Sequence, residues 1–281
     1  MQNVKYGFAL GGGGTRAYSQ IGAMAYLEEK GIKPTFISGT SMGAIHALLL
    51  GMGFNVQGIC DFYRNKSAFS LFELSIGKNY LISNKKLGRV IKKICEAKGF
   101  KNLEDLPIKT AICVTDAKTN QPVFLSKGDI VEAILATTAT YQTQMFDVQD
   151  EVIKKQVCQQ TGQTYFEGIK ILLKDGCYGA NVPFEGLDLL RDNKDHLYYD
   201  FCFDVVPYYK KSIIKSFDTF NLNVFKNDQK RKEKFLKERK GCYMEFNSGL
   251  SSVAFGKKYL HKGITFGKKV TESYIKNQST K

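Results

Sequence analysis

Hydrophobic and polar positions alternate in blocks that predict strands and helices in turn. An apolar run at Lys5–Leu10 is followed at once by glycines, which indicates a buried strand and a turn. Apolar residues then recur at helical spacing over 16–30. A short strand at Phe36–Ile37 and an almost wholly apolar helix at Ala44–Leu50 come next. This β-α-β-α opening predicts a parallel sheet with right-handed crossovers.

The later blocks extend the same α/β pattern. We expect helices at Asn84–Lys98 and from Asp129 to about Ala139, and strands at Ile108–Val114, Pro122–Leu125, Ile169–Leu173 and Leu197–Val206. Beyond Tyr208 the chain becomes basic, and no further strand is predicted. Because no repeat or clean linker interrupts the pattern, we expect one catalytic domain over 1–207. Residues 208–281 are then a basic C-terminal elaboration, packed on that domain or continuing it.

Composition narrows the class of protein. The 281 residues are 43% hydrophobic and 24% charged, which is typical of a folded globular chain. The longest strongly apolar stretch, Met42–Gly53, is shorter than the ~20 residues that cross a bilayer, and Met1–Gly14 lacks the regions of a signal peptide. Seven cysteines without CxxC pairs favour reduced thiols over disulfides or zinc. We therefore expect a cytoplasmic protein, one that could also sit peripherally at membranes.

The charge of the chain points to an anionic partner. Counting 41 Lys and Arg against 27 Asp and Glu gives a net charge of +14, which would attract nucleic acid or acidic phospholipid. No nucleic-acid recognition motif is found, so a phospholipid membrane surface is the expected partner. The aromatic segment 66–80 could form an interfacial lid or simply an ordinary packed helix and loop. The basic run 226–240 could bind anionic headgroups or form a solvated helix.

The most specific motif is Gly39-Thr40-Ser41-Met42-Gly43, a GxSxG between a predicted strand and a predicted helix. Such an elbow holds its serine in a strained conformation at the helix N-terminus, where the helix dipole stabilises developing negative charge. The pattern therefore favours Ser41 as a nucleophile. A serine in an ordinary turn or N-cap is the alternative.

A glycine run, Gly11–Gly14, directly follows the first strand. Successive glycines let several amides point into one space, as an oxyanion hole requires. Glycine runs also cradle phosphate, but a dinucleotide site needs an acidic residue at the end of the second strand, and that strand ends at Ser38-Gly39. A Walker A loop is excluded because no Gly-Lys-Ser/Thr follows.

A nucleophilic serine needs a base, and the histidines are poor candidates. His46 is turned about 140° from Ser41 on the same helix, whereas His196 and His261 lie in a polar turn and in the basic tail without a motif. Asp175 stands at the end of an apolar strand beside Gly176. A carboxylate there can act directly as the base, although strand-end Asp-Gly is also a common turn.

Three separated segments, Gly11–Arg16, Gly39–Gly43 and Asp175-Gly176, together resemble the patatin-like phospholipases. The resemblance covers roughly residues 5–205 and implies a three-layer α/β/α fold with a mainly parallel central sheet. It also implies a serine acyl hydrolase that cleaves fatty-acyl esters of phospholipids or lysophospholipids without a metal or a cofactor. Some members of this family need a protein activator.

The resemblance assigns roles to individual residues. It makes Ser41 the acyl nucleophile and Asp175 its base in a Ser-Asp dyad, with an acyl-enzyme intermediate. Arg16 would hold the glycine loop or attract a lipid phosphate, unless it only forms an ion pair at a helix start. The expected oxyanion hole consists of the amides of Gly12, Gly13 and Gly14, and the expected supporting glycines are Gly39, Gly43 and Gly176.

The sequence departs from the family pattern at Ala17, at Cys177 and at Thr137–Thr140, and it is longer than usual over 144–168. Two alternatives stay open. One is a Ser-His-Asp esterase that uses His196 or His261, and the other is a catalytically silent membrane-binding protein of the same fold.

Overall fold

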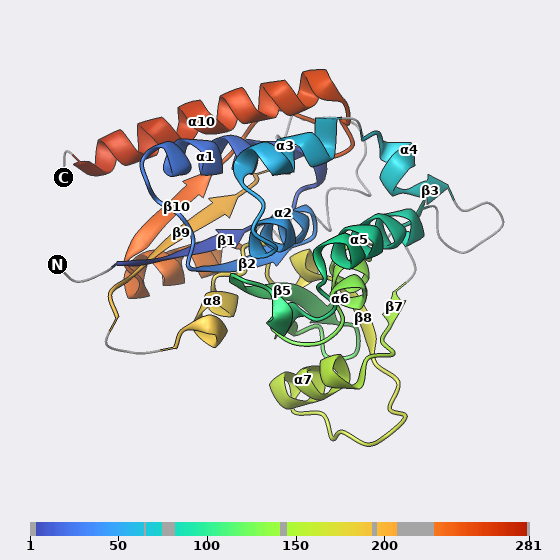
Figure 1. Ribbon diagram of the computed structural model, residues 1–281. Coiled ribbons are helices and arrows are strands. Elements are labelled where there is room, and N and C mark those ends of the chain that lie inside the picture. Colours follow the sequence, from blue (N-terminus) through green and yellow to red (C-terminus); the bar gives the residue numbers. More distant parts are fainter. Residues whose placement is uncertain are drawn as a thin grey trace, which may run out of the picture.

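The computed structural model describes residues 4–64, 66–74, 82–140, 145–192, 196–206 and 228–279. Its centre is an eight-stranded sheet in the order β10-β9-β1-β2-β5-β8-β7, with β6 paired to β5 (Figure 1). The strands are β1 (Lys5–Leu10), β2 (Phe36–Thr40), β5 (Lys109–Asp116), β6 (Pro122–Leu125), β7 (Phe146–Asp147), β8 (Leu172–Asp175), β9 (Tyr198–Asp204) and β10 (Gly241–Glu245). A separate two-stranded sheet pairs β3 (Glu73–Leu74) with β4 (Ile82–Ser83).

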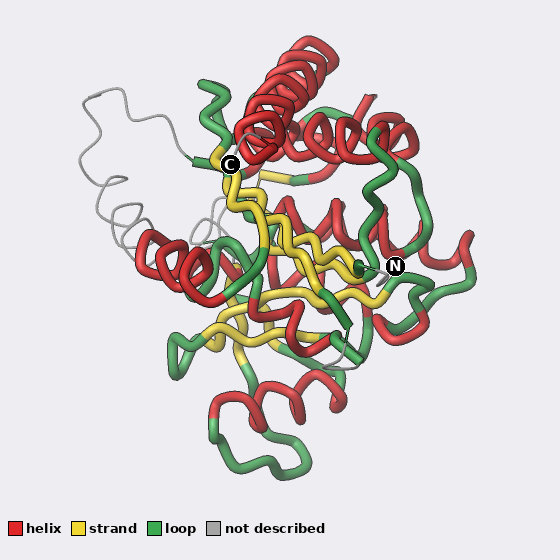
Figure 2. The backbone as a smooth tube through the Cα atoms, turned by 90° about the vertical axis from the view of Figure 1, so that its left-hand side faces the viewer, coloured by secondary structure: helices red, strands yellow, loops and turns green. Residues whose placement is uncertain are grey.

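Helices cover both faces of the central sheet (Figures 1 and 2). They are α1 (Tyr18–Glu29), α2 (Met42–Gly51), α3 (Val56–Arg64), α4 (Ala68–Leu71), α5 (Lys85–Lys98), α6 (Ile130–Thr137), α7 (Glu151–Thr161), α8 (Glu185–Leu190), α10 (Lys257–Ser279) and a helix over 228–238. The pairs from β10 through β9, β1 and β2 to β5 are parallel, and those of β6, β7 and β8 are antiparallel. The mainly parallel α/β fold expected from the sequence is confirmed.

Alternate residues of β1 fill two cores. Phe8 and Leu10 of β1 belong to the large core that also contains residues of α1 and α2. Ala9 between them points to the opposite face, into a smaller core with Leu187 of α8 and Phe235 of the 228–238 helix. This period of two is the geometry of a strand buried on both faces, and it explains why the strand reads as a continuous apolar run.

The C-terminal part of the chain contributes to this sheet and its layers. The strand β10 extends the sheet beyond β9, and α10 lies along α1 (Figure 1). The two helices approach closely because glycines line the contact. A Cβ on Gly22 would lie 1.9 Å from the Ile264 carbonyl oxygen, and one on Gly267 would lie 1.8 Å from that of Ser19.

The expected elements are found with shifts of a few residues at their ends, but several elements were not predicted, among them β7 and α8. The sequence predicted no strand after β9, yet β10 is present, and neither α7 nor α10 was assigned. The signals for α7 were local ones, since Asp150 caps its first amides and Gly162 ends it in the left-handed conformation. Within the described residues, no helix combines the length and the apolar character that a membrane span needs.

Part of two predicted surface segments falls outside the described residues. In the proposed lid at 66–80, residues 75–80 lie outside them, and so do residues 226–227 of the basic run. The remainder of that run is not simply a solvated helix. Phe235 is fully buried, Arg231 is ion-paired to Glu185, and Arg239 is ion-paired to Asp188 and Asp200.

Candidate active site

The pairing of β2 and β8 with β5 places Ser41 beside Asp175. The last residue of β2, Thr40, pairs with Cys113 of β5, and the last residue of β8, Asp175, pairs with the next position, Val114. Because β2 runs parallel and β8 antiparallel to β5, the carboxyl ends of the two strands face each other along it. The serine that follows β2 therefore comes to lie next to the carboxylate that ends β8.

Ser41 has the backbone of a nucleophile elbow. Its φ of 53° and ψ of −122° are strained values for a residue with a side chain, and it caps the N-terminus of α2. Its amide donates to the Thr137 hydroxyl at 2.9 Å, and that hydroxyl donates to the Cys113 carbonyl at 2.5 Å. The strained turn is therefore fixed to β5 through Thr137. Sequence reasoning missed this role and noted the segment only as a departure from the family.

The flanking glycines of the motif are required by close contacts. A Cβ on Gly43 would lie 2.3 Å from the Leu10 carbonyl oxygen, and one on Gly39 would lie 2.6 Å from the Ala44 Cα. A Cβ on Gly176 would lie 2.3 Å from the Cys113 carbonyl oxygen. Larger residues at these positions would push the elbow away from β1 or the Asp175 turn away from β5.

Asp175 is buried, with 1% of its surface exposed, and its carboxylate accepts a hydrogen bond from the Ser41 hydroxyl. The Cys177 amide donates to the same carboxylate at 3.0 Å. Burial raises the pKa of Asp175 to about 6, although these hydrogen bonds favour the charged form. The carboxyl group is therefore ionised at neutral pH and can accept a proton.

The turn after Asp175 is held on both sides. The Asp175 amide donates to the Ala139 carbonyl at 2.8 Å, and the Thr115 hydroxyl donates to the Asp175 carbonyl at 3.0 Å. Burial, and then the adjacent Asp175 carboxylate, raise the pKa of the Cys177 thiol well above its usual value. Cys177 therefore stays a neutral thiol next to the carboxylate.

The glycine loop passes directly beside the serine. A Cβ on Gly12 would lie 3.1 Å from the Ser41 Cβ. The Gly12 amide donates to the side-chain oxygen of Asn181 at 3.1 Å. Among the described residues, no acceptor pairs with the amides of Gly13 and Gly14, which adopt φ values of 149° and 58°. Arg16 donates from Nε to the Gly13 carbonyl at 3.0 Å, as a residue that supports this loop would.

The 228–238 helix supports the loop that carries Asn181. The Asn181 amide donates to the Asp228 carboxylate, and Arg231 donates to the Val182 carbonyl at 2.7 Å. Burial and the nearby Asp204 raise the pKa of Asp228 to about 7. The C-terminal part of the chain is thus connected to the glycine loop through Asn181, and no local pattern in the sequence indicates this link.

Among the described residues, none of the three histidines forms a hydrogen bond or an ion pair with Ser41 or Asp175. His46 is buried, and its Nδ1 is 3.0 Å from the Gln20 side-chain oxygen. Burial lowers its pKa to about 3, so it is neutral. His196 precedes β9 at the amino-terminal edge of the sheet, 3.8 Å from Asp192, and His261 is exposed on α10.

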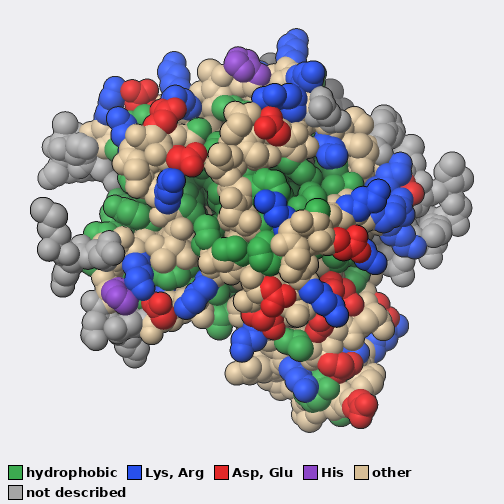
Figure 3. Space-filling model, in the orientation of Figure 1, with side chains coloured by type: hydrophobic (Ala, Val, Ile, Leu, Met, Phe, Trp, Pro, Cys, Tyr) green, Lys and Arg blue, Asp and Glu red, His purple; other side chains and the backbone are tan. Residues whose placement is uncertain are grey.

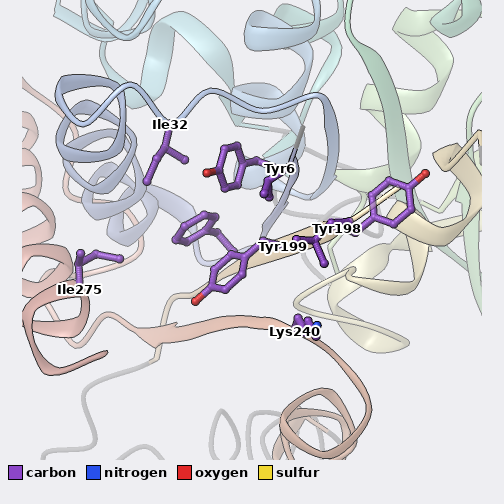
Figure 4. Close-up of a pocket in the computed structure, with 9 residues that line it drawn as sticks. Tyr6, Ile32, Tyr198, Tyr199, Lys240 and Ile275 are labelled. Carbon is purple, nitrogen blue, oxygen red and sulfur yellow. The ribbon is translucent and has the colours of Figure 1, made fainter. Parts of the chain in front are cut away.

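A separate pocket opens at the opposite edge of the sheet. Its volume is about 310 Å³, and it is lined mainly by apolar and aromatic residues, including Tyr6, Ile32, Tyr199 and Ile275, with Lys240 at its side (Figure 4). These residues lie near the start of β1 and β9, whereas Ser41 follows the end of β2. The described residues contain no group of three or more His, Cys, Asp or Glu that could hold a metal ion.

Residues 8–188 match the family model for patatin-like phospholipase. That match covers more than half of the chain, and this protein therefore belongs to the patatin-like phospholipase family. The resemblance seen in the sequence is confirmed.

The curated relatives are larger proteins. Lysophospholipase NTE1 of Candida albicans is 32% identical over 118 residues, which are 39% of this chain and 8% of that protein. An uncharacterized NTE family protein of Mycobacterium tuberculosis is 28% identical over 138 residues, which are 47% of this chain and 36% of that protein. The chain therefore matches a minor part of each.

Two solved structures are similar to most of this chain. VipD from Legionella pneumophila has a TM-score of 0.45 at 11% identity, and covers 97% of this chain and 67% of its own. The type III effector protein ExoU has a TM-score of 0.43 at 12% identity, and covers 99% of this chain and 54% of its own.

Proposed function

We propose that this protein is a serine acyl hydrolase that cleaves fatty-acyl esters of phospholipids or lysophospholipids. The observation that carries the proposal is the strand register that brings Ser41 beside the buried Asp175 carboxylate, next to the glycine loop. Family membership and the name of the Candida relative support a lipid ester as the substrate class.

In the proposed mechanism Asp175 takes the proton of the Ser41 hydroxyl as the serine oxygen attacks the ester carbonyl. The amides of Gly13 and Gly14 stabilise the oxyanion, and the Gly12 amide joins them only if it leaves Asn181. The proton on Asp175 passes to the leaving alcohol, and an acyl-enzyme remains. Water activated by Asp175 then releases the fatty acid and restores Ser41.

Two observations bear on the alternatives. A Ser-His-Asp esterase would need His196 or His261 at Ser41, whereas His196 lies 3.8 Å from Asp192 before β9 and the side chain of His261 is exposed on α10. The strained backbone of Ser41 costs on the order of 1–3 kcal/mol. In a catalytically silent protein, no function would offset that cost beside a buried carboxylate. Both observations favour the Ser-Asp dyad.

The test combines active-site labelling with turnover. A fluorophosphonate should label the wild-type chain at Ser41 and should not label Ser41→Ala. Hydrolysis of lysophospholipid and of a soluble p-nitrophenyl ester should fall by about a thousandfold or more in Ser41→Ala and in Asp175→Asn. Replacement of His196 or His261 by alanine is the matched control and should leave both activities unchanged.

Label that persists in Ser41→Ala, or activity that is lost with either histidine, would refute the dyad. Because some patatin-like enzymes need a protein activator, labelling is measured first, since it reports on Ser41 without turnover.

A further inference from the structure

The segment over 251–262 lies directly on the glycine loop. The Thr15 amide donates to the Ser252 carbonyl at 2.9 Å, and the Thr15 hydroxyl donates to the Ser251 carbonyl at 2.8 Å. The Ala254 amide in turn donates to the Thr15 hydroxyl at 2.8 Å. A Cβ on Gly14 would lie 2.2 Å from the Ser252 carbonyl oxygen, so the two backbones are in close contact.

Apolar side chains project from this segment into solvent. Val253 is 66% exposed and Tyr259 is 41% exposed. Val253 stands in the turn before α10, and Tyr259 lies in the first turn of that helix. Phe255, in the same segment, packs against Phe72 with ring centroids 6.3 Å apart. This contact connects the segment to the first part of the proposed lid at 66–80.

The charge around these side chains is of one sign. Between Glu245 and Glu272 the sequence has no acidic residue. Lys257, Lys258 and Lys262 are exposed, and none forms an ion pair with another described residue. In the space-filling view, basic side chains stand along the edge of the molecule that α10 forms (Figure 3).

The basic 228–238 helix also exposes lysines and one apolar side chain, Leu236, but its charges are mixed. Its Arg231 is bound to Glu185 and its Lys232 to Glu245, and Glu233 and Glu238 alternate with its exposed lysines. For this run the sequence left two interpretations open, a headgroup-binding surface and a solvated helix. We favour the segment that starts at Ser251 instead, because no acidic residue lies among its exposed lysines and because it contacts the glycine loop.

We propose that residues 251–262 dock the protein on an anionic phospholipid bilayer. Val253 and Tyr259 enter the interface, and Lys257, Lys258 and Lys262 contact lipid phosphates. Exposed apolar residues favour a bilayer over nucleic acid, which would be bound by the lysines alone. This inference rests on the proposed function, because its consequence is that the glycine loop and Ser41 face the lipid.

Co-sedimentation of the full chain with vesicles tests the proposal. Vesicles of phosphatidylcholine with phosphatidylglycerol should bind the wild type, and vesicles of phosphatidylcholine alone should bind it more weakly. A lysine near an anionic surface contributes about fivefold in affinity, so K257Q/K258Q/K262Q should weaken binding roughly a hundredfold. V253S/Y259S should weaken binding to both kinds of vesicle.

The 228–238 helix supplies matched controls. K230Q/K234Q/K237Q removes the same number of exposed lysines, and Leu236→Ser removes an apolar side chain that is 58% exposed. Leu236→Ser should bind vesicles as the wild type does. K230Q/K234Q/K237Q should lose only the small part of the affinity that follows from its lower net charge. Equal losses in the two sets, or wild-type binding to duplex DNA and not to vesicles, would overturn the docking proposal.

Turnover of a soluble p-nitrophenyl ester separates this proposal from the proposed function. Ester hydrolysis without vesicle binding would overturn the docking surface and leave the hydrolase. Vesicle binding that depends on residues 251–262, with no hydrolysis and no fluorophosphonate label, would overturn the hydrolase and leave the docking surface.

Discussion

Asn181 accepts the amide hydrogen of Gly12 through its side-chain oxygen at 3.1 Å. Gly12 belongs to the glycine loop after β1, whereas Asn181 belongs to the turn after Asp175. The bond therefore joins the proposed oxyanion loop to the segment that carries the proposed base. Since Asp228 accepts from the Asn181 amide, the same unit extends to the C-terminal part of the chain.

Asn181→Ala should reduce kcat by about tenfold with a small change in KM, because the glycine loop loses the acceptor that fixes it. Asn181→Asp keeps an acceptor and should retain more activity than the alanine variant. Steady-state kinetics on a soluble ester measure both. A larger change in KM than in kcat would instead assign Asn181 to substrate binding.

The pH dependence of activity should follow Asp175. Burial raises its pKa to about 6, and only the ionised carboxylate can accept the serine proton. The kcat/KM for a soluble ester should therefore rise about tenfold per pH unit below about pH 6 and level off above it. A rate that stays level down to about pH 4.5 would contradict a base with this pKa.

The free energy of unfolding should fall as pH rises from about 4 to 7, whereas activity should rise as pH increases toward about 6. Burial raises the pKa of Asp204 to about 6 and that of Asp228 to about 7, whereas an unfolded aspartate titrates near ~4. Between about pH 4 and 7 the native state holds protons that the unfolded state releases, so the free energy of unfolding falls as pH rises. Urea unfolding at several pH values should show this fall.

Asp204→Asn should flatten that fall, because an amide stays neutral. Asp192→Asn is the control. A hydrogen bond from Lys5 lowers the pKa of Asp192 to about 2. Asp192 therefore adds to the free energy of unfolding as pH rises from about 2 to 4, which is below the range from about pH 4 to 7 in which the fall is measured. An unchanged slope in Asp204→Asn would exclude Asp204 as a cause.

The contact between α1 and α10 should be sensitive to one methyl group. Gly267→Ala would place a Cβ 1.8 Å from the Ser19 carbonyl oxygen, and the overpacking should lower the free energy of unfolding by about 1–3 kcal/mol. Thr265→Ala, at an exposed position of the same helix, should have little effect. Chemical denaturation of both variants measures the difference, and equal stability would show that the helices can separate without cost.

Much of the fold is determined by local patterns in the sequence. The apolar run before Gly11 and the helical spacing of apolar residues after Arg16 are enough to place β1 and α1, because both patterns act within a few residues. The strand-elbow-helix arrangement around Ser41 is equally local, since only glycine fits where Gly39 and Gly43 approach neighbouring backbone.

Only the tertiary structure decided which residues far apart in the chain come into contact. Asp175 meets Ser41 because β2 and β8 end at consecutive positions of β5, and that register depends on pairings between segments far apart in the chain. The roles of Thr137, Asn181 and Asp228 arise in the same way, from contacts that no local pattern encodes. The basic C-terminal residues divide into buried ion pairs and an exposed surface for the same physical reason: charge can be counted from composition, but burial is set by packing.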